Sequence, residues 1–284
     1  MRPKVSVVMA THHADPEMLR ESVECVLGQT FADLEFVIVD DVNGEAATAY
    51  LESLADRDSR VRLFKNSNNI GLTASLVRAI AESRGEYVAR QDADDVSHPK
   101  RLELQVSKLE KEPETILLGT WYCVQSSKLG DIHYHPPDDS DVLKRQLYLT
   151  NPFCHASVLF RRTAYDQSGG YDPTFNTTQD LDLWFRMAAS GRLGILEKEL
   201  VIRRLEQTSL TFSRKAWHQV RNSFRCRWRE RSAYPGRAGT LIILSASAYH
   251  AIITLLPISI GGFFAHLVRR LRGLIRSGGI GAAH

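Results

Sequence analysis

Short apolar runs and stretches of helical periodicity alternate along the first third of the chain. Residues 5–10 (VSVVMA) and 34–39 (LEFVIV) are rich in β-branched residues and bounded by polar ones, which is typical of strands buried on both faces. Between them, Asp15 and Pro16 favour a helix start, and apolar residues then recur at helical spacing until Gly28. These three segments predict a β-α-β unit.

The same alternation extends to about residue 111. It predicts further strands at 61–64 and 86–89 and helices at 45–55, 73–83 and 101–111. Alternating strands and helices predict an α/β fold with a Rossmann-like, mostly parallel sheet flanked by helices. Ligands bind such a sheet at the carboxyl ends of its strands.

The pattern changes around a connection at residues 135–139 that is rich in Pro and Asp. Apolar segments on either side of it predict strands at 116–124 and 156–160. A Gly-Gly turn at 169–170 precedes a helix that begins near Asp180 and has one apolar face. The second half of the body is therefore also expected to be α/β.

Composition and charge separate the chain into a body and a tail. Of the 284 residues, 43% are hydrophobic and 24% are charged, which excludes a disordered or fibrous protein. Four widely spaced cysteines exclude a zinc ribbon and the disulfide framework of a small secreted domain. The net charge is +3, but residues 214–284 carry +11 and residues 1–213 carry −8. The chain therefore has an acidic body and a basic tail.

The tail contains 31 consecutive residues, 238–268, without Asp, Glu, Lys or Arg. About 20 apolar residues span a bilayer as a helix, so this segment predicts contact with lipid. Pro257 and Gly261-Gly262 interrupt the run and both flanks are basic, which favours a hairpin or interfacial helices over a single span. We expect a peripheral or re-entrant attachment to the cytoplasmic face of the cell membrane. A buried pair of hydrophobic helices is the alternative.

The strongest chemical signal is Asp92-Ala93-Asp94-Asp95, directly after a predicted strand. Three carboxylates within four residues repel one another unless solvent, a cation or a partner charge compensates them. Mg²⁺ or Mn²⁺ is held in proteins by one or two carboxylates and bridges to nucleotide phosphates. A solvated acidic turn would be an equally good interpretation of this cluster alone.

Six segments follow one another in a fixed order along residues 4–210. They are VSVVMATHH, ESVECVLGQTFADLEFVIVDD, NNIGLTASLVRAI, RGEYVARQDADDVSHPKRLELQ, NPFCHASVLFRR and GGYDPTFNTTQDLDLWFRMA. On these segments the chain resembles the inverting family 2 glycosyltransferases, which have the GT-A fold. The resemblance implies one GT-A domain with a nucleotide-sugar-binding half at 1–112 and an acceptor-binding, catalytic-base half at 113–212. A basic, apolar, membrane-associating helical tail at 213–284 completes the expected organisation.

The resemblance assigns donor-binding roles to residues at the strand ends. Thr11 and Asp40 would contact the base or ribose of the nucleotide. Asn69 and Gly71 match an N-x-G block, where glycine permits close approach of the backbone.

The acidic cluster matches the DxD motif of the family. Asp94 would be the direct ligand of Mg²⁺ or Mn²⁺, and Asp92 would lie near the ribose or the ion, while Asp95 would begin the next turn. Arg90 and Arg101 could pair with this turn or with phosphate, and a surface ion pair is the alternative for each.

The resemblance also places the catalytic base at Asp180. That carboxylate would take the proton from the acceptor hydroxyl. It is preceded by Gln179 where the family usually has Glu, and a purely structural role as helix N-cap is the alternative. Asp182 is a competing carboxylate that points away along the helix. Glu206 stands where the family commonly has a metal-binding His and could ligate the cation, and His155 would lie near the acceptor or be structural.

These assignments imply transfer of one sugar from a UDP- or dTDP-linked donor to a lipid-linked or polysaccharide-precursor acceptor. The QxxRW signature of processive synthases is absent from the sequence, which favours single transfer. Nucleic acid is not expected as a partner, because carboxylates occupy the predicted strand ends. A nucleotidyltransferase and a non-catalytic membrane-binding adaptor are the alternatives.

Overall fold

The structure is a computed structural model that describes residues 2–127, 130–205, 216–231 and 243–244. The chain divides into two compact units, Met1–Glu206 and Gln207–His284. The candidate chemistry lies in the first unit. The division of that unit at residue 112 remains a prediction.

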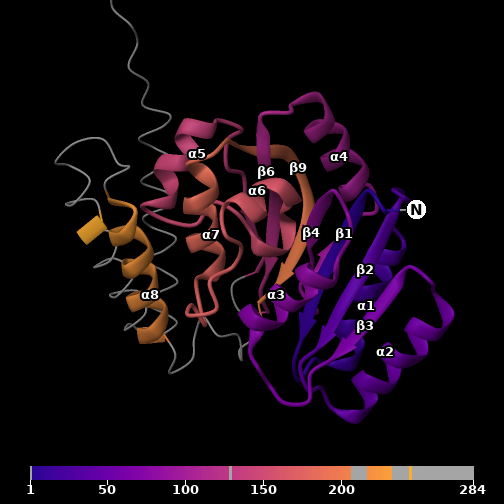
Figure 1. Ribbon diagram of the computed structural model, residues 1–284. Helices are drawn as coiled ribbons and strands as arrows, with labels where there is room; N and C mark the ends of the chain where they lie inside the picture. Colours follow the sequence, from indigo (N-terminus) through magenta and orange to yellow (C-terminus); the bar gives the residue numbers. More distant parts are fainter. Residues whose placement is uncertain (1, 128–129, 206–215, 232–242, 245–284) are drawn as a thin grey trace, which may run out of the picture. The chain divides into compact units, whose positions relative to one another are not determined.

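The amino-terminal part of the first unit has the predicted alternation. Its elements are β1 (Val5–Thr11), α1 (Pro16–Leu27), β2 (Leu34–Asp40), α2 (Glu45–Arg57), β3 (Val61–Lys65), α3 (Leu72–Glu82) and β4 (Tyr87–Arg90). The strands lie in the order β3-β2-β1-β4 and all three pairings are parallel (Figure 1). Asp15 caps α1 by accepting hydrogen bonds of 3.0 Å from the backbone N–H groups of Glu17 and Met18.

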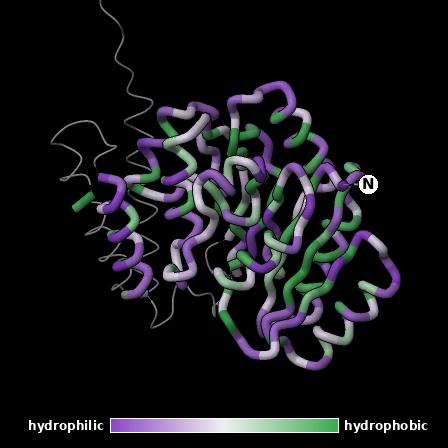
Figure 2. The backbone as a smooth tube through the Cα atoms, viewed as in Figure 1, coloured by the Kyte–Doolittle hydropathy of each residue, from purple (hydrophilic) through white to green (hydrophobic). Residues whose placement is uncertain are grey.

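Strands β1 and β2 are buried along their whole length, which explains why their sequences are continuous apolar runs rather than alternating ones. They appear as hydrophobic paths through the centre of the fold (Figure 2). On one face they pack with α1 and α2 in a core that includes Val7, Leu19, Phe36 and Leu51. This core fixes the strand ends that carry polar side chains.

The second part extends the same sheet with different pairings. Its elements are β5 (Val96–Ser97), α4 (Arg101–Lys111), β6 (Thr115–Gln125), β7 (Ile132–Tyr134), α5 (Ser140–Leu147), η1 (a 3₁₀ helix, His155–Ser157), β8 (Leu159–Arg161), α6 (Arg162–Gln167), α7 (Gln179–Ala188) and β9 (Arg192–Arg204). The sheet continues as β4-β8-β6-β9-β5, and β7 pairs with β6.

The prediction of a mostly parallel sheet is wrong for this part. Strand β8 is antiparallel to both β4 and β6, β7 is antiparallel to β6 and β5 is antiparallel to β9, whereas β6 and β9 are parallel. Parallel neighbours need a long crossover, while the short turn from β6 to β7 allows only a hairpin. The nine described strands therefore form one mixed sheet.

The strand predicted at 156–160 is shorter and starts later. Residues His155–Ser157 form a 3₁₀ turn, and the strand covers Leu159–Arg161. The turn forms because Ser157 bonds back to the carbonyl oxygen of Cys154 through both its backbone N–H (3.0 Å) and its hydroxyl (2.9 Å). Periodicity could not distinguish this buried turn from a strand, since all of its neighbours are apolar.

The described part of the second unit contains helix α8 (Ala216–Arg229), which carries the basic residues expected of the tail. No described helix is both long enough and apolar enough to cross a bilayer. Of the apolar run 238–268, only residues 243–244 are described. The predicted membrane attachment therefore falls on residues outside the described ones.

Candidate active site

The parallel strands bring three polar segments to one edge of the sheet. Thr11 at the end of β1 is in register with Asp40 at the end of β2. On the other side of β1, Arg90 ends β4, and the chain runs on directly into the acidic cluster. The strand ends thus collect the predicted donor-binding residues and the carboxylates, as expected for the ligand edge of an α/β sheet.

Asp40 holds the loop that follows β2. Its Oδ1 accepts hydrogen bonds from the backbone N–H (2.9 Å) and side-chain amide (2.7 Å) of Asn43, and its Oδ2 accepts one from the Thr48 hydroxyl (2.7 Å). Asn43 in turn accepts a 3.3 Å bond from the Thr11 hydroxyl. Both predicted residues therefore build the frame of this edge. Their contact with a nucleotide remains a prediction.

Asp41, to which sequence reasoning gave no role, positions the loop that contains Asn69 and Gly71. It accepts bonds from the side chain of Asn66 (2.7 Å) and from the backbone N–H groups of Ile70 and Gly71 (2.9 Å each). Gly71 has φ 85°, a conformation that favours glycine. The only signal for a role of Asp41 in the sequence was that it follows Asp40. Because consecutive residues of an extended chain point to opposite sides, the two aspartates would be expected to have different partners.

His12 links this loop to the end of β2. Its Nδ1 lies 2.6 Å from the carbonyl oxygen of Asp41, and its Nε2 lies 2.7 Å from Nδ2 of Asn69. An amide nitrogen can only donate, so Nε2 accepts and Nδ1 carries the proton. The predicted residue Asn69 is thus held by His12 beside the edge that is predicted to bind the sugar donor.

The three non-glycine residues with left-handed backbone in the described chain all lie near this site. They are His13 (φ 48°), Val42 (φ 67°) and Thr178 (φ 60°). A β-branched residue such as Val42 is a clear outlier in this conformation. Strain of this kind persists only where the surroundings enforce it, and it clusters at functional sites.

The acidic cluster has the composition of a site for a hard cation. Carboxylate oxygens of Asp92, Asp94 and Asp95 all lie within 4.8 Å of one another. Burial, and then the charge of Asp92, raises the pKa of Asp94 to about 6. The pKa of Asp95 is raised well above its usual value by burial and by both neighbouring carboxylates.

Asp95 adds a further observation. Its Oδ1 accepts a 3.0 Å bond from the backbone N–H of Arg204, whereas its buried Oδ2 has no hydrogen-bond partner among the described residues. A buried acceptor without a partner costs free energy unless a ligand or ion satisfies it. The donor set of carboxylate oxygens fits Mg²⁺ or Mn²⁺, and Asp95 contributes more than the start of a turn.

Two arginines face the carboxylates. Arg90 is 1% exposed and pairs with the carboxylate of Asp92, so the surface ion pair considered from the sequence is wrong. The positive charges of Arg90 and Arg203 both lower the pKa of Asp94 and so oppose the increase that burial causes. Arg203, near the end of β9, lies in the segment that the resemblance places close to the metal through Glu206, but its own role depends on the fold, which brings it to a segment more than 100 positions away.

Arg101 is neither a phosphate ligand nor a surface residue. It is 2% exposed, and its guanidinium donates to the carbonyl oxygens of Arg90 (2.9 Å) and Val158 (3.2 Å) and to the hydroxyl of Ser97 (2.8 Å). Burial lowers its pKa to about 10. Arg101 therefore holds the end of β4 against the segment that leads into β8.

Asp180 lies in the first turn of α7, and Thr178 occupies the N-cap position, so the N-cap alternative is wrong. Its Oδ2 accepts a 2.7 Å bond from Nδ2 of Asn151, a residue that sequence reasoning did not single out. Burial raises the pKa of Asp180, while Arg90 and Arg203 oppose the shift. A partly buried carboxylate with a raised pKa is suited to accept a proton.

The competing candidates have other partners. Asp182 is buried and its Oδ2 accepts a 2.7 Å bond from Arg186 on the next turn of α7, so it is not available as a base. His155 Nε2 lies 2.7 Å from the hydroxyl of Tyr171, and burial holds the pKa of His155 well below its usual value. Glu206 lies outside the described residues, and its role as a metal ligand remains a prediction.

Residues 6–169 match the protein family described as Glycosyl transferase family 2. The chain is a family 2 glycosyltransferase. Membership of this family excludes the two alternatives that the sequence left open, a nucleotidyltransferase and a non-catalytic membrane-binding adaptor.

Relatives of this family 2 glycosyltransferase support the same conclusion. EpsE of Bacillus subtilis (strain 168), named a putative glycosyltransferase, is 32% identical over 76% of this chain and 77% of its own length. The O-antigen biosynthesis glycosyltransferase WbnJ of Escherichia coli is 29% identical over 64% of this chain and 71% of its own.

Solved structures show that the fold is GT-A-like. S. aureus TarS residues 1–349 superpose with a TM-score of 0.66 at 14% identity, covering 87% of this chain and 71% of that chain. The mannosyltransferase PcManGT from Pyrobaculum calidifontis, in complex with GDP-Man and Mn²⁺, superposes with a TM-score of 0.65 at 18% identity, covering 88% and 70%.

Proposed function

We propose that this glycosyltransferase transfers a single sugar, with inversion, from a UDP- or dTDP-linked donor to a lipid-linked or polysaccharide-precursor acceptor. The observation that carries the proposal is the pair of sites at one sheet edge. Asp92, Asp94 and Asp95 bring three carboxylates within reach of one cation, and a separate, partly buried carboxylate, Asp180, has a raised pKa.

Asp92 and Asp94 would hold Mg²⁺ or Mn²⁺, with Asp95 close by. When bound, such an ion neutralises the charge that develops on the departing diphosphate. Arg90 and Arg203 add fixed positive charge around the same carboxylates. A nucleoside diphosphate would otherwise meet strong repulsion at this edge.

Asp180 supplies the base for the displacement. The acceptor oxygen forms a bond to the anomeric carbon as the bond from that carbon to the diphosphate oxygen breaks, and the hydroxyl proton passes to the Asp180 carboxylate. A single displacement from the opposite side inverts the anomeric centre. Asn151 orients the carboxylate through its 2.7 Å hydrogen bond. The base is therefore in position before the sugar-accepting substrate binds.

The acceptor and location rest on the relatives and the tail. The name of WbnJ refers to O-antigen biosynthesis, which supports a polysaccharide precursor as acceptor. The basic flanks and apolar run of residues 213–284 support attachment to the cytoplasmic face of the membrane. High salt screens charges but not apolar burial, so a salt wash should leave the full-length enzyme with membranes.

A donor screen tests the proposed reaction. Nucleotide sugars would be compared for protection of the full chain against thermal unfolding, with and without Mn²⁺. The best donor would then be incubated with candidate acceptors. The mass and the anomeric configuration of the product would be determined. Retained configuration, or addition of many sugars per acceptor, would contradict the proposal.

A further inference from the structure

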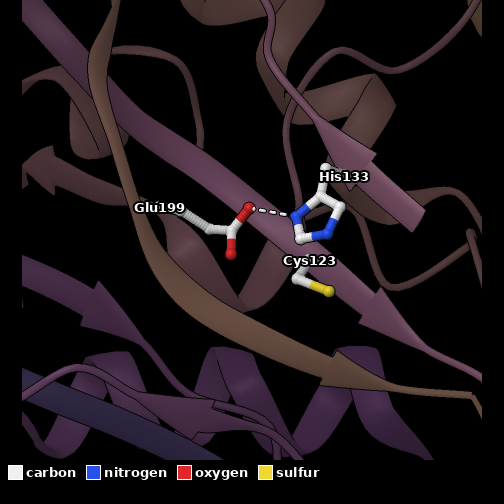
Figure 3. A group of neighbouring side chains, drawn as sticks. All are labelled: Cys123, His133 and Glu199. Carbon is white, nitrogen blue, oxygen red and sulfur yellow. Dashed lines mark hydrogen bonds and ion pairs between the residues drawn. The ribbon is translucent and has the colours of Figure 1, made fainter. Parts of the chain in front are cut away.

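A second cluster of metal-ligating side chains lies on the outer part of the sheet, on strands β6, β7 and β9. Cys123 on β6 is directly opposite His133 on β7, and Trp121, two residues earlier on β6, is opposite Glu199 on β9. The pairing of β6 with β9 has an irregularity between Trp121 and Tyr122, and the donor atoms of Cys123, His133 and Glu199 lie close together beside it. Figure 3 shows Glu199 facing His133, with Cys123 beside the imidazole ring.

The donor atoms are close enough to share one ion. The Cys123 sulfur, a ring nitrogen of His133 and a carboxylate oxygen of Glu199 all lie within 4.8 Å of one another. Nδ1 of His133 is 2.6 Å from Oε2 of Glu199, and Nε2 of His135 is 3.7 Å from the same oxygen. Bonds of about 2.0–2.3 Å to zinc place tetrahedral ligand atoms roughly 3.3–3.8 Å apart, so the 2.6 Å contact between His133 and Glu199 would have to open as the ion enters between them.

Exposure differs among the three ligands in a way that suits entry of an ion from solvent. Cys123 is only 3% exposed, whereas the side chains of His133 and Glu199 are 52% and 34% exposed. The sulfur thus forms the floor of the cluster, and the two polar groups form its rim. A lone buried cysteine would not indicate a site, but here two further ligand types from different strands meet it.

We propose that Cys123, His133 and Glu199 form a binding site for zinc or a similar borderline divalent ion, with His135 or water as the remaining ligand. Thiolate, imidazole and carboxylate together are typical of zinc, whereas the all-carboxylate cluster of the active site suits harder ions. The two sites should therefore discriminate between metals.

Binding of an ion at this cluster would release a proton. Burial, followed by the charges of Asp131 and Glu199, raises the pKa of the Cys123 thiol. Without a cation the thiol keeps its proton. A divalent ion would compensate the negative charges, and the proton would leave to solvent as the sulfur–metal bond forms.

The site is separate from the reaction centre but shares strand β9 with it. On β6 and β9, Cys123 is in register with Ile202, while the next pair is Val124 and Arg203. Successive residues point to opposite faces, so the proposed ion lies on the face opposite Arg203. Binding would join the β6–β7 hairpin to β9 near the strand end that carries this arginine.

Metal titration of the full-length, chelator-treated protein tests the proposal. Co²⁺ would be added with excess Mg²⁺ present, and the absorption of a cobalt–thiolate bond would be recorded, followed by displacement with Zn²⁺. We expect one equivalent of cobalt with thiolate absorption that zinc displaces. Absence of thiolate absorption in the wild-type protein would overturn the site.

Variants identify the ligands. Cys123→Ser should abolish the thiolate absorption, and His133→Gln and Glu199→Gln should each weaken binding at least tenfold, since even indirect partners of a metal typically contribute about 10–100-fold. The latter two side chains are half-exposed, so these variants remain informative if Cys123→Ser fails to fold. Cys25→Ser and Asp94→Ala are the matched controls and should bind cobalt normally. Unchanged cobalt affinity in both His133→Gln and Glu199→Gln would overturn the metal site and show that His133 and Glu199 form only an ion pair.

Discussion

Two aspartate groups at the same sheet edge differ in how their hydrogen bonds are satisfied. Asp40 and Asp41 are buried, and their oxygens accept bonds from neighbouring loops. Asp94 and Asp95 are crowded by like charges, and Asp95 retains a buried oxygen without a partner among the described residues. Satisfied carboxylates form a rigid frame, whereas unsatisfied ones require a ligand. The contrast separates residues that shape the site from residues that bind or react.

The largest effect is expected at Asp180, a carboxylate outside both groups that we propose as the catalytic base. Asp180→Asn should lower turnover by about 10²–10⁴, the usual cost of losing a general base, while affinity for the donor nucleotide stays near wild type. Single-turnover kinetics and nucleotide binding measure the two quantities. Asp182→Asn is the control, because it breaks a buried ion pair and should lower stability but not the turnover of folded enzyme. Retention of more than about a tenth of turnover by Asp180→Asn would show that another group is the base.

Removing the cation should affect donor binding next. EDTA and Asp94→Ala should each weaken nucleotide affinity at least tenfold, since a unit charge at about 4 Å near a protein surface contributes several kcal/mol. Calorimetric titration with and without Mn²⁺ measures this. EDTA should have no further effect on Asp94→Ala, while His133→Gln should respond to EDTA as the wild type does, which separates the two metal sites. Equal nucleotide affinity under all conditions would exclude the role of the cation.

On the framework side, Asp41→Ala should act on stability. It leaves three donors of the 66–71 loop without their acceptor, which typically costs about 1–3 kcal/mol. Asp58→Ala is a matched control, because Asp58 pairs with the partly exposed Arg60 and such pairs contribute up to about 1 kcal/mol. Denaturant titration compares the variants. The frame interpretation fails if Asp41→Ala unfolds no more easily than Asp58→Ala.

The smallest expected effect is a pH dependence of stability. The pKa of Asp94 is about 6 in the fold against its usual 3.8, so between these values the folded state binds more protons than the unfolded state. Its contribution to stability therefore falls as pH rises from about 4 to 6, by only about 1 kcal/mol because solvent screens this exposed carboxylate. Asp94→Asn should remove this fall, and Mn²⁺ should offset it in the wild type. Parallel stability profiles of wild type and Asp94→Asn would contradict the shift.

Local patterns predicted the first half of the fold well. The runs that became β1 and β2 are continuous and apolar, and Asp15 with Pro16 marks the start of α1. The insertion of β8 between β4 and β6 could not be predicted, because it depends on a pairing between distant segments rather than on local periodicity.

The candidate site divides in the same way. Asp92, Asp94 and Asp180 could be assigned because each lies in a segment that resembles the family. Asn151 begins a segment that resembles the family and Arg203 lies near Glu206, but their particular roles depend on contacts made only in the fold. The cluster around Cys123 has no metal-binding spacing in the sequence, because its ligands come from three separate strands.

The central place of β4 has a consequence during protein synthesis. Strand β4 lies between β1 and β8. Strand β1 has already left the ribosome when Tyr87–Arg90 emerges, but β8 begins only at Leu159. At about 5–20 residues per second, the outer edge of β4 stays unpaired for several seconds. An unpaired strand edge is a template for pairing with other chains. Nascent chains that stall before residue 159 should therefore aggregate through β4 unless a chaperone covers that edge.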